Sequence, residues 1–375
     1  MHAIDPVDLT ARLIACNSVT PADGGAQGVL AEALEGIGFT VHRLRSGEAP
    51  DGPIANLFAI RGTQGPHLAF AGHTDVVPPG AGWASDPFTP AIRGDLLHGR
   101  GAVDMKGAIA AFAAAASRTG QAGTLSLIIT GDEEGPATYG TPALIDWMAE
   151  RGVRPDMILV GEPTSATRLG DTIKIGRRGS VNLTIIVPGR QGHVAYPHLA
   201  ENPVPVLARI VGALAALELD RGTGWFQPSN LEVTDIATGN VAANVIPGTA
   251  RARINIRFND LHSGAALVER VKQTVAEISP AAQVEARISG EAFRTDPGPL
   301  SDLVAAAIRD RLGITPEHST SGGTSDARFL VALAPTIEFG LVNATMHKLD
   351  EAVAVADLHA LADTYAAIIE RAVSS

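Results

Sequence analysis

The sequence contains a single cysteine, Cys16, among its 375 residues. One cysteine excludes an internal disulfide framework and any zinc site built from cysteines. The chain also lacks a stretch of roughly 20 apolar residues, the length that a membrane-spanning helix needs. Its first residues lack the basic segment and the apolar segment of a secretory signal peptide. We therefore expect a cytoplasmic protein with no membrane partner.

Charged residues are scarce, at 18% of the chain, and basic residues are outnumbered by acidic ones, 29 against 40, for a formal net charge of −11. An acidic chain of this kind argues against a nucleic-acid or anionic-membrane surface. Apolar residues make up 45% of the sequence, which is too hydrophobic for a disordered chain. The length predicts two domains.

The first half of the sequence alternates short apolar segments with helical ones. Strands are expected at 56–61, 66–72, 124–130 and 157–160, and helices at 104–119 and 141–151. This alternation predicts an α/β fold with a mostly parallel sheet flanked by helices.

The pattern changes near Gly176 and changes back after Phe293. Between them we expect strands at 172–188, 230–260 and 283–289 and helices at 203–219 and 263–278. Their β-α-β-β-α-β order is typical of a small ferredoxin-like α+β domain with an antiparallel sheet. A helix at 299–312, a strand at 335–339 and a final helix from 350 then resume the first pattern. We therefore predict one domain from residues 1–178 plus 294–375, interrupted by an inserted domain at 179–293.

Ionisable side chains follow three of the expected strands. His73 and Asp75 follow one strand, Glu133 and Glu134 follow another, and Glu162 follows a third. One acid after a strand is usually a cap or a turn residue. Three such strand ends suggest a site, because ligands of open α/β sheets bind outside the carboxyl ends of the strands.

The residue types at these positions suit a metal ion. The adjacent carboxylates of Glu133 and Glu134 resist burial unless a cation compensates them, although a solvated loop would also tolerate them. Histidine and carboxylates without cysteine favour a hydrolytic Zn²⁺ or a related divalent ion. His73 and Asp75 share one face of an extended segment, so Asp75 can accept the second ring N–H of a metal-bound His73. Asp104 fits either a helix cap or a bridge between two metals.

Several segments carry a resemblance to a known family over nearly the whole chain. Four segments match the metal-binding motifs of that family: GHTDVVPPG (72–80), GRGAVDMKG (99–107), TGDEEG (130–135) and GEPTS (161–165). In their order and spacing, these segments resemble the dinuclear zinc aminoacylase/carboxypeptidase (M20-type) metallopeptidase family. Five further segments resemble one branch of that family more narrowly. They are GRRGSV (176–181), GHVAYPHLAENP (192–203), NVIPG (244–248), SGGTSDARF (321–329) and HKLDE (347–351).

The resemblance implies two Zn²⁺ per subunit, with Co²⁺ as an alternative in one site. His73 and Glu162 would hold one ion, and Glu134 and His347 would hold the other. Asp104 would bridge the two ions, and its peptide bond to Met105 would be cis.

The resemblance also implies the catalytic residues of an amide hydrolase. Glu133 would be the general base, with Asp75 also in the catalytic set. His193 of the inserted domain would be an oxyanion donor that reaches across a homodimer, and an ordinary surface histidine is an equally weighted alternative.

The implied substrate is a small anionic amide derived from an amino acid. Its expected contacts are Arg177, Arg178, Ser180, Tyr196, Asn244, Arg257, Gly323, Thr324 and Asn343. Arginine forks bind carboxylates in a bidentate manner, although a lone arginine is more often solvated. Two alternatives stay open: another family amidase, such as an acetylornithine deacetylase or an aminoacylase, and a non-catalytic metal-binding scaffold.

Overall fold

The computed structural model describes residues 3–120 and 122–373, and these separate into two compact units. Unit 1 comprises the chain up to Ile175, Thr295–Ser319 and the chain from Ser325 onward. Unit 2 comprises Gly176–Arg294 and Thr320–Thr324. The inserted domain expected at 179–293 thus differs from unit 2 by three residues at its start, by one at its end and by the short segment after Ser319.

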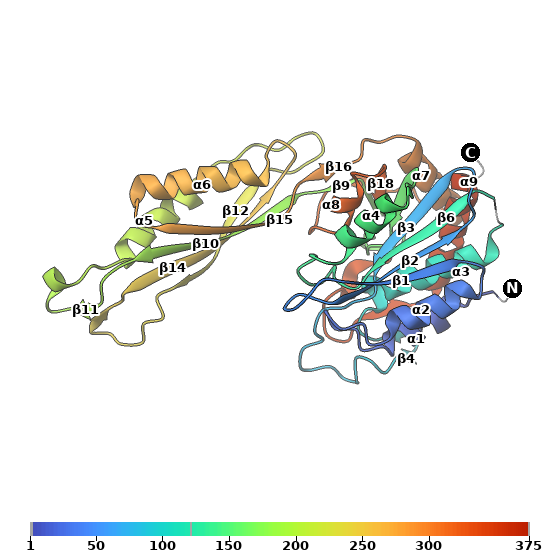
Figure 1. Ribbon diagram of the computed structural model, residues 1–375, viewed down its shortest axis with the longest axis horizontal. Coiled ribbons are helices and arrows are strands. Elements are labelled where there is room, and N and C mark those ends of the chain that lie inside the picture. Colours follow the sequence, from blue (N-terminus) through green and yellow to red (C-terminus); the bar gives the residue numbers. More distant parts are fainter. Residues whose placement is uncertain (1–2, 121, 374–375) are drawn as a thin grey trace. The chain divides into compact units, whose positions relative to one another are not determined.

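Unit 1 is built on a mixed sheet flanked by helices (Figure 1). Within the described residues the sheet has eight strands in the order β1-β2-β6-β3-β7-β18-β8-β17. Their bounds are β1 (Thr40–Ser46), β2 (Ile54–Arg61), β3 (His67–His73), β6 (Thr124–Thr130), β7 (Met157–Val160), β8 (Thr172–Lys174), β17 (Glu317–Ser319) and β18 (Thr336–Glu338). Because β6, β3, β7 and β18 are mutually parallel, their carboxyl ends lie along one edge. The predicted α/β class with a mostly parallel sheet is confirmed.

The helices of unit 1 enclose an alanine-rich core. They are α1 (Pro6–Ile14), α2 (Ala26–Glu35), α3 (Gly107–Arg118), α4 (Thr141–Glu150), α7 (Pro299–Leu312), α8 (Ala327–Leu330) and α9 (Val355–Val373). Helix α3 packs against α1 and α9 and is buried from Gly107 to Ala116. The ring of Phe112 stacks on that of Phe70 at 4.3 Å, and the Tyr365 hydroxyl donates to the Phe339 carbonyl at 2.6 Å. This core supports the strands that carry the candidate site.

Short elements complete unit 1 and correct two expected boundaries. They are β4 (Ala91–Arg93), β5 (Leu96–His98), β19 (Ala352–Ala354), η1 (Ala102–Lys106) and η3 (Asn343–Thr345). The helix expected from Asp104 begins at Gly107, because Asp104 and Met105 have non-helical backbone angles. The Asp104–Met105 peptide bond is cis, as expected. The final helix begins at Val355 rather than at residue 350, because β19 first pairs with β5.

Unit 2 has the predicted β-α-β-β-α-β order. The elements are β10 (Gly179–Pro188), α5 (Val204–Ala215), β12 (Asn230–Ala237), β14 (Thr249–Phe258), α6 (Gly264–Ile278) and β15 (Gln283–Gly290). The sheet order is β12-β14-β10-β15, with antiparallel neighbours. Buried and less buried residues alternate along β14, and α5 and α6 pack on this sheet. One face of the sheet therefore forms the core of unit 2.

Two long strands expected in this region are each interrupted. Short elements around them are β9 (Gly176–Arg177), β11 (Gly192–His193), η2 (Pro197–Leu199), β13 (Val245–Ile246) and β16 (Phe293–Arg294). The segment 172–188 contains β8, β9 and β10, since the chain passes from unit 1 to unit 2 within it. The segment 230–260 is divided by the loop that contains β13.

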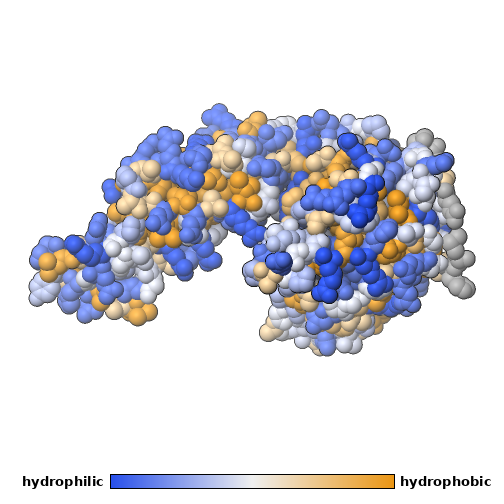
Figure 2. Space-filling model, viewed as in Figure 1, coloured by the Kyte–Doolittle hydropathy of each residue, from blue (hydrophilic) through white to orange (hydrophobic). Residues whose placement is uncertain are grey.

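On the face in Figure 2, hydrophobic patches are interspersed with hydrophilic residues. Across residues 3–120 and 122–373, none of the helices has the length and apolar character needed to cross a membrane.

Candidate metal centre and active site

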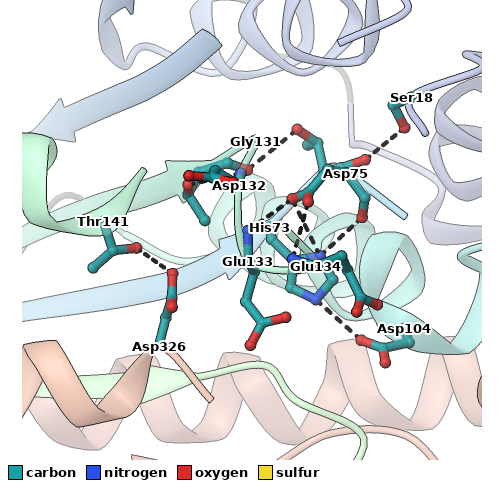
Figure 3. A network of polar contacts seen from close by, with 12 residues as sticks. Ser18, His73, Asp75, Asp104, Gly131, Asp132, Glu133, Glu134, Thr141 and Asp326 are labelled. Atoms are coloured by element: carbon teal, nitrogen blue, oxygen red, sulfur yellow. Dashed lines mark hydrogen bonds and ion pairs between the residues drawn. The ribbon is translucent and has the colours of Figure 1, made fainter. Parts of the chain in front are cut away.

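The carboxyl edge of the sheet in unit 1 gathers the ionisable residues that follow its strands. His73 is the last residue of β3, Glu133 and Glu134 follow β6, and Glu162 follows β7. Figure 3 shows His73 beside Asp104, with Glu133 and Glu134 close by. The parallel register of these strands brings together side chains that are far apart in the sequence.

Asp104 lies between two histidines. Its Oδ1 atom is 3.0 Å from Nε2 of His73, and its Oδ2 atom is 3.2 Å from Nε2 of His347. Each histidine also faces a glutamate: His73 Nε2 lies 3.8 Å from Oε1 of Glu162, and His347 Nε2 lies 2.8 Å from Oε1 of Glu134. The cluster thus has two halves that share the Asp104 carboxylate.

The donor atoms of this cluster fit divalent metal ions. The possible ligand atoms of His73, Asp104 and Glu134 all lie within 4.8 Å of one another, and so do those of His73, Glu133 and Glu162. Imidazole nitrogen and carboxylate oxygen without sulfur are the ligands of hydrolytic zinc and related ions. Glu133 therefore offers a carboxylate oxygen within 4.8 Å of donor atoms of both His73 and Glu162.

The Asp75 carboxylate supports this cluster through hydrogen bonds with backbone N–H groups, and not through the expected contact with the His73 ring. Its carboxylate accepts the backbone N–H of Glu133 at Oδ1 (3.3 Å) and that of Glu134 at Oδ2 (3.0 Å). His73 Nδ1 lies 2.9 Å from the Asp75 backbone oxygen but 3.7 Å from its carboxylate. The expected carboxylate–imidazole contact is therefore replaced by a backbone carbonyl, because the carboxylate is engaged by the acidic loop. Burial raises the pKa of Asp75 to about 6.

The pKa shifts at the site show a local excess of negative charge. Burial, reinforced by the Glu162 carboxylate, raises the pKa of Glu133 well above its usual value. Hydrogen bonds with Asp104 and Glu134 raise the pKa of His347 to about 10. A divalent cation would compensate this excess, since an opposite charge favours ionised carboxylates.

Unit 2 contains a group of arginines near one end of its central strands. Ser180 in β10 is paired with Arg257 in β14. Burial lowers the pKa of Arg178, and the positive charge of Arg257 lowers it further. Arg178 Nη1 donates to Asn230 Oδ1 at 2.9 Å. Arg177 Nη1 donates to the Gly323 carbonyl at 3.0 Å.

The expected histidine donor and its neighbours lie around β11 and β13. The Val194 N–H donates to the Asn244 carbonyl at 3.1 Å, and the rings of His193 and Tyr196 are 5.7 Å apart. The Ala195 N–H donates to His193 Nδ1 at 3.1 Å. The neutral imidazole then carries its proton on Nε2, and the side chain is exposed.

The last two expected substrate contacts lie in different units. Thr324 belongs to unit 2, where its hydroxyl oxygen is buried without a hydrogen-bond partner among the described atoms. Asn343 begins η3 in unit 1, and its backbone N–H donates to the Ser165 carbonyl at 2.9 Å.

Some buried charged residues near this edge were missed by the sequence analysis. Asp326 accepts the Thr141 hydroxyl at 2.6 Å. Arg100 and Glu351 form a buried ion pair at 2.8 Å. All three charged residues lie inside segments that resemble the family, and these segments were the available signal. The roles of the three residues could not be assigned from the sequence, because their partners are distant in the chain.

A histidine–carboxylate cluster at the carboxyl edge of such a sheet is typical of metal-dependent hydrolases. Residues 69–371 match the model of peptidase family M20/M25/M40. The chain belongs to this family and is a hydrolase.

Known proteins resemble the chain over nearly its full length. The succinyl-diaminopimelate desuccinylase of Rhizorhabdus wittichii is 71% identical over 367 residues, which cover 98% of this chain and 97% of the relative. The fold is shared with the M20 family metallo-carboxypeptidase Sso-CP2 from Sulfolobus solfataricus (TM-score 0.82, 15% identity, 99% and 100% covered). It is also shared with the YXEP protein of Bacillus subtilis, described as a dinuclear metal-binding peptidase (TM-score 0.71, 16% identity, 98% and 97% covered).

Proposed function

We propose that the chain hydrolyses the amide bond of N-succinyl-LL-2,6-diaminopimelate, giving succinate and LL-2,6-diaminopimelate for lysine biosynthesis. The observation that carries this proposal is 71% identity, over 98% of the chain, to a succinyl-diaminopimelate desuccinylase. The ligand cluster of unit 1 supports the hydrolytic chemistry.

Two Zn²⁺ ions fit the two halves of the cluster, with Co²⁺ as an alternative in one. His73 and Glu162 would hold one ion, Glu134 and His347 the other, and Asp104 would serve both. When bound, such ions lower the pKa of a water molecule and polarise a carbonyl group. The opposed contacts of the Asp104 oxygens with His73 and His347 support this division.

Glu133 would act as the general base. It would take a proton from the attacking water and pass it to the amine that leaves as the amide bond breaks. Its raised pKa suits a group that must hold this proton between the two steps. Asp75 would hold Glu133 and Glu134 in position by accepting hydrogen bonds from their backbone N–H groups.

The substrate carries several carboxylates, and the arginines of unit 2 would recognise them. Guanidinium groups of Arg177, Arg178 and Arg257 suit bidentate pairing with carboxylates. The remaining proposed contacts are Ser180, Tyr196, Asn244, Gly323, Thr324 and Asn343.

His193 would donate a hydrogen bond to the developing oxyanion in the partner subunit of a homodimer. Its exposed side chain and its Nδ1 acceptor role leave the Nε2 proton to be donated. In this proposal unit 2, the predicted inserted domain, serves as the dimerisation domain and as a lid.

Substrate selectivity tests the proposed reaction. Turnover of N-succinyl-LL-2,6-diaminopimelate is compared with turnover of N-acetylornithine, using protein loaded with Zn²⁺ and protein treated with a chelator. We expect succinate release that requires metal and exceeds acetate release. Faster turnover of the acetyl substrate would place the chain among the other family amidases, and no metal-dependent turnover of either would favour a scaffold.

Mixing two inactive variants tests the dimer. His193→Ala and Glu133→Gln are combined under conditions that allow subunits to exchange. If His193 acts in trans, one site of each mixed dimer keeps both groups, and activity returns. Proven heterodimers without recovered activity would contradict the trans role.

A further inference from the structure

The carboxylate of Glu351 is buried and receives four donors. Its Oε1 atom accepts the backbone N–H groups of Val103 (2.8 Å) and Asp104 (3.2 Å). Its Oε2 atom accepts the Gly101 N–H (3.0 Å) and Nη1 of Arg100 (2.8 Å). The side chain is 1% exposed. Both oxygens of one carboxylate therefore hold the turn that ends at Asp104.

Among the described residues, the N–H groups of Gly101, Val103 and Asp104 make no helical hydrogen bond, whereas the Ala102 N–H donates to the Gly99 carbonyl at 3.2 Å. Asp104 and Met105 have non-helical backbone angles, and regular helix begins only at Gly107. Gly101 has a φ of +84°, and a Cβ atom there would lie 2.7 Å from Val76 Cγ1. Buried N–H groups need a partner, and Glu351 supplies it to Gly101, Val103 and Asp104.

Glu351 also belongs to the segment that carries His347. The Gly99 N–H donates to the Glu351 carbonyl at 2.9 Å. The backbone and the side chain of Glu351 therefore both accept hydrogen bonds from the same turn. The next residues form β19, which pairs with β5. One short segment thus connects His347 to the backbone of Asp104.

We propose that Glu351 is a positioning residue for the metal centre, which orders the Asp104 carboxylate relative to His347, with Arg100 as its counter-ion. This inference rests on the proposed function, because it takes Asp104 as the ligand shared by both ions. Partners that orient metal ligands typically change metal affinity on the order of 10–100-fold when they are removed. Because Asp104 serves both halves, loss of Glu351 weakens both sites together.

Glu351→Gln is the variant that tests this role. In either orientation its amide places an NH₂ group against donors, since both carboxylate oxygens of Glu351 accept N–H groups. Zn²⁺ affinity is measured by competition with a chelator, and thermal unfolding is measured on the same proteins without metal. We expect the affinity of both sites to fall on the order of 10–100-fold.

Asp171→Asn is the matched control. The Asp171 carboxylate also accepts backbone N–H groups at both oxygens, from Ala166 at Oδ1 and from Thr167 and Arg168 at Oδ2, but it contacts none of the proposed ligands. This variant should unfold at a lower temperature and keep the wild-type Zn²⁺ affinity. Arg100→Met and Arg100→Lys form a second pair, in which methionine lowers the affinity and lysine restores most of it.

Three outcomes overturn the inference. They are wild-type Zn²⁺ affinity in Glu351→Gln, an equal affinity loss in Asp171→Asn, and loss at one site alone. If Glu351→Gln does not fold, unchanged affinity in Arg100→Met overturns it instead. A wild-type protein that binds no pair of ions would contradict the proposed function itself, which is a different result from a variant-specific loss.

Discussion

Replacing Asp75 by asparagine weakens the support of the acidic loop while nearly preserving the shape of the side chain. The two Asp75 oxygens accept different N–H groups, from Glu133 and from Glu134. An asparagine can keep only one of these bonds, because its NH₂ group must face the other donor. The variant therefore loosens either the proposed base or a proposed ligand.

The expected size of the effect follows from the lost bond. A hydrogen bond to a buried charged group contributes about 1.5–3 kcal/mol, and about 1.4 kcal/mol corresponds to a factor of ten. Asp75→Asn should therefore reduce kcat/KM on the order of 10–100-fold, a range that is also typical for residues supporting metal ligands.

Asp132→Asn is a matched control in the same loop. The backbone N–H groups of Thr138 and Tyr139 both donate to its Oδ2 atom, while its Oδ1 atom has no hydrogen-bond partner among the described atoms. An asparagine can keep both bonds and place its NH₂ group at the Oδ1 position. Steady-state kinetics and metal content are measured for both variants, and equal losses of activity would refute the reasoning for Asp75.

Further predictions concern the metal ligands and the acid stability of unit 2. Asp104→Ala should lose more metal at limiting Zn²⁺ than any other single ligand variant, whereas His347→Ala should empty mainly one site. Equal metal loss by elemental analysis would contradict the shared role of Asp104. The prediction for acid stability concerns Asp220. Burial alone would raise the pKa of its carboxyl group, but hydrogen bonds from Ser229 and other donors lower this pKa from 3.8 to about 2. Its ionised form therefore stabilises the fold above pH 3.8, and this contribution fades as the pH falls towards 2. Asp220→Asn should thus be less stable at neutral pH, with a difference that shrinks in acid, and urea unfolding that shows a constant difference would contradict this.

The strand-end part of the site could be predicted because it depends on local pattern. Short apolar runs mark parallel strands, and the residue after each run must lie at the carboxyl edge of the sheet. His73, Glu133 and Glu162 follow this rule. The β-α-β-β-α-β order of unit 2 could be predicted in the same way, from strand and helix periodicity.

The supporting residues could not be predicted because their partners are distant in the sequence. Glu351 contacts the backbone of Asp104 across 247 positions, and no local pattern indicates such a pairing. The same contact explains the misplaced start of α3, because the alanine-rich pattern predicts a helix from Asp104 while tertiary bonds hold Asp104 and Val103 in a turn. The Asp75 contact was misassigned for a related reason, since the N–H groups that occupy its carboxylate come from another strand end.

Glu133→Gln gives the most direct test of the account. Glutamine keeps the size of the side chain but cannot accept the proton of the attacking water. Metal content and turnover of N-succinyl-LL-2,6-diaminopimelate are measured on the same preparation. We predict that the metal content stays close to that of the wild type while turnover falls on the order of 10²–10⁴-fold, the usual contribution of a positioned base. Near-normal turnover, or loss of the metal with the activity, would contradict the assignment of Glu133 as the base at a metal centre.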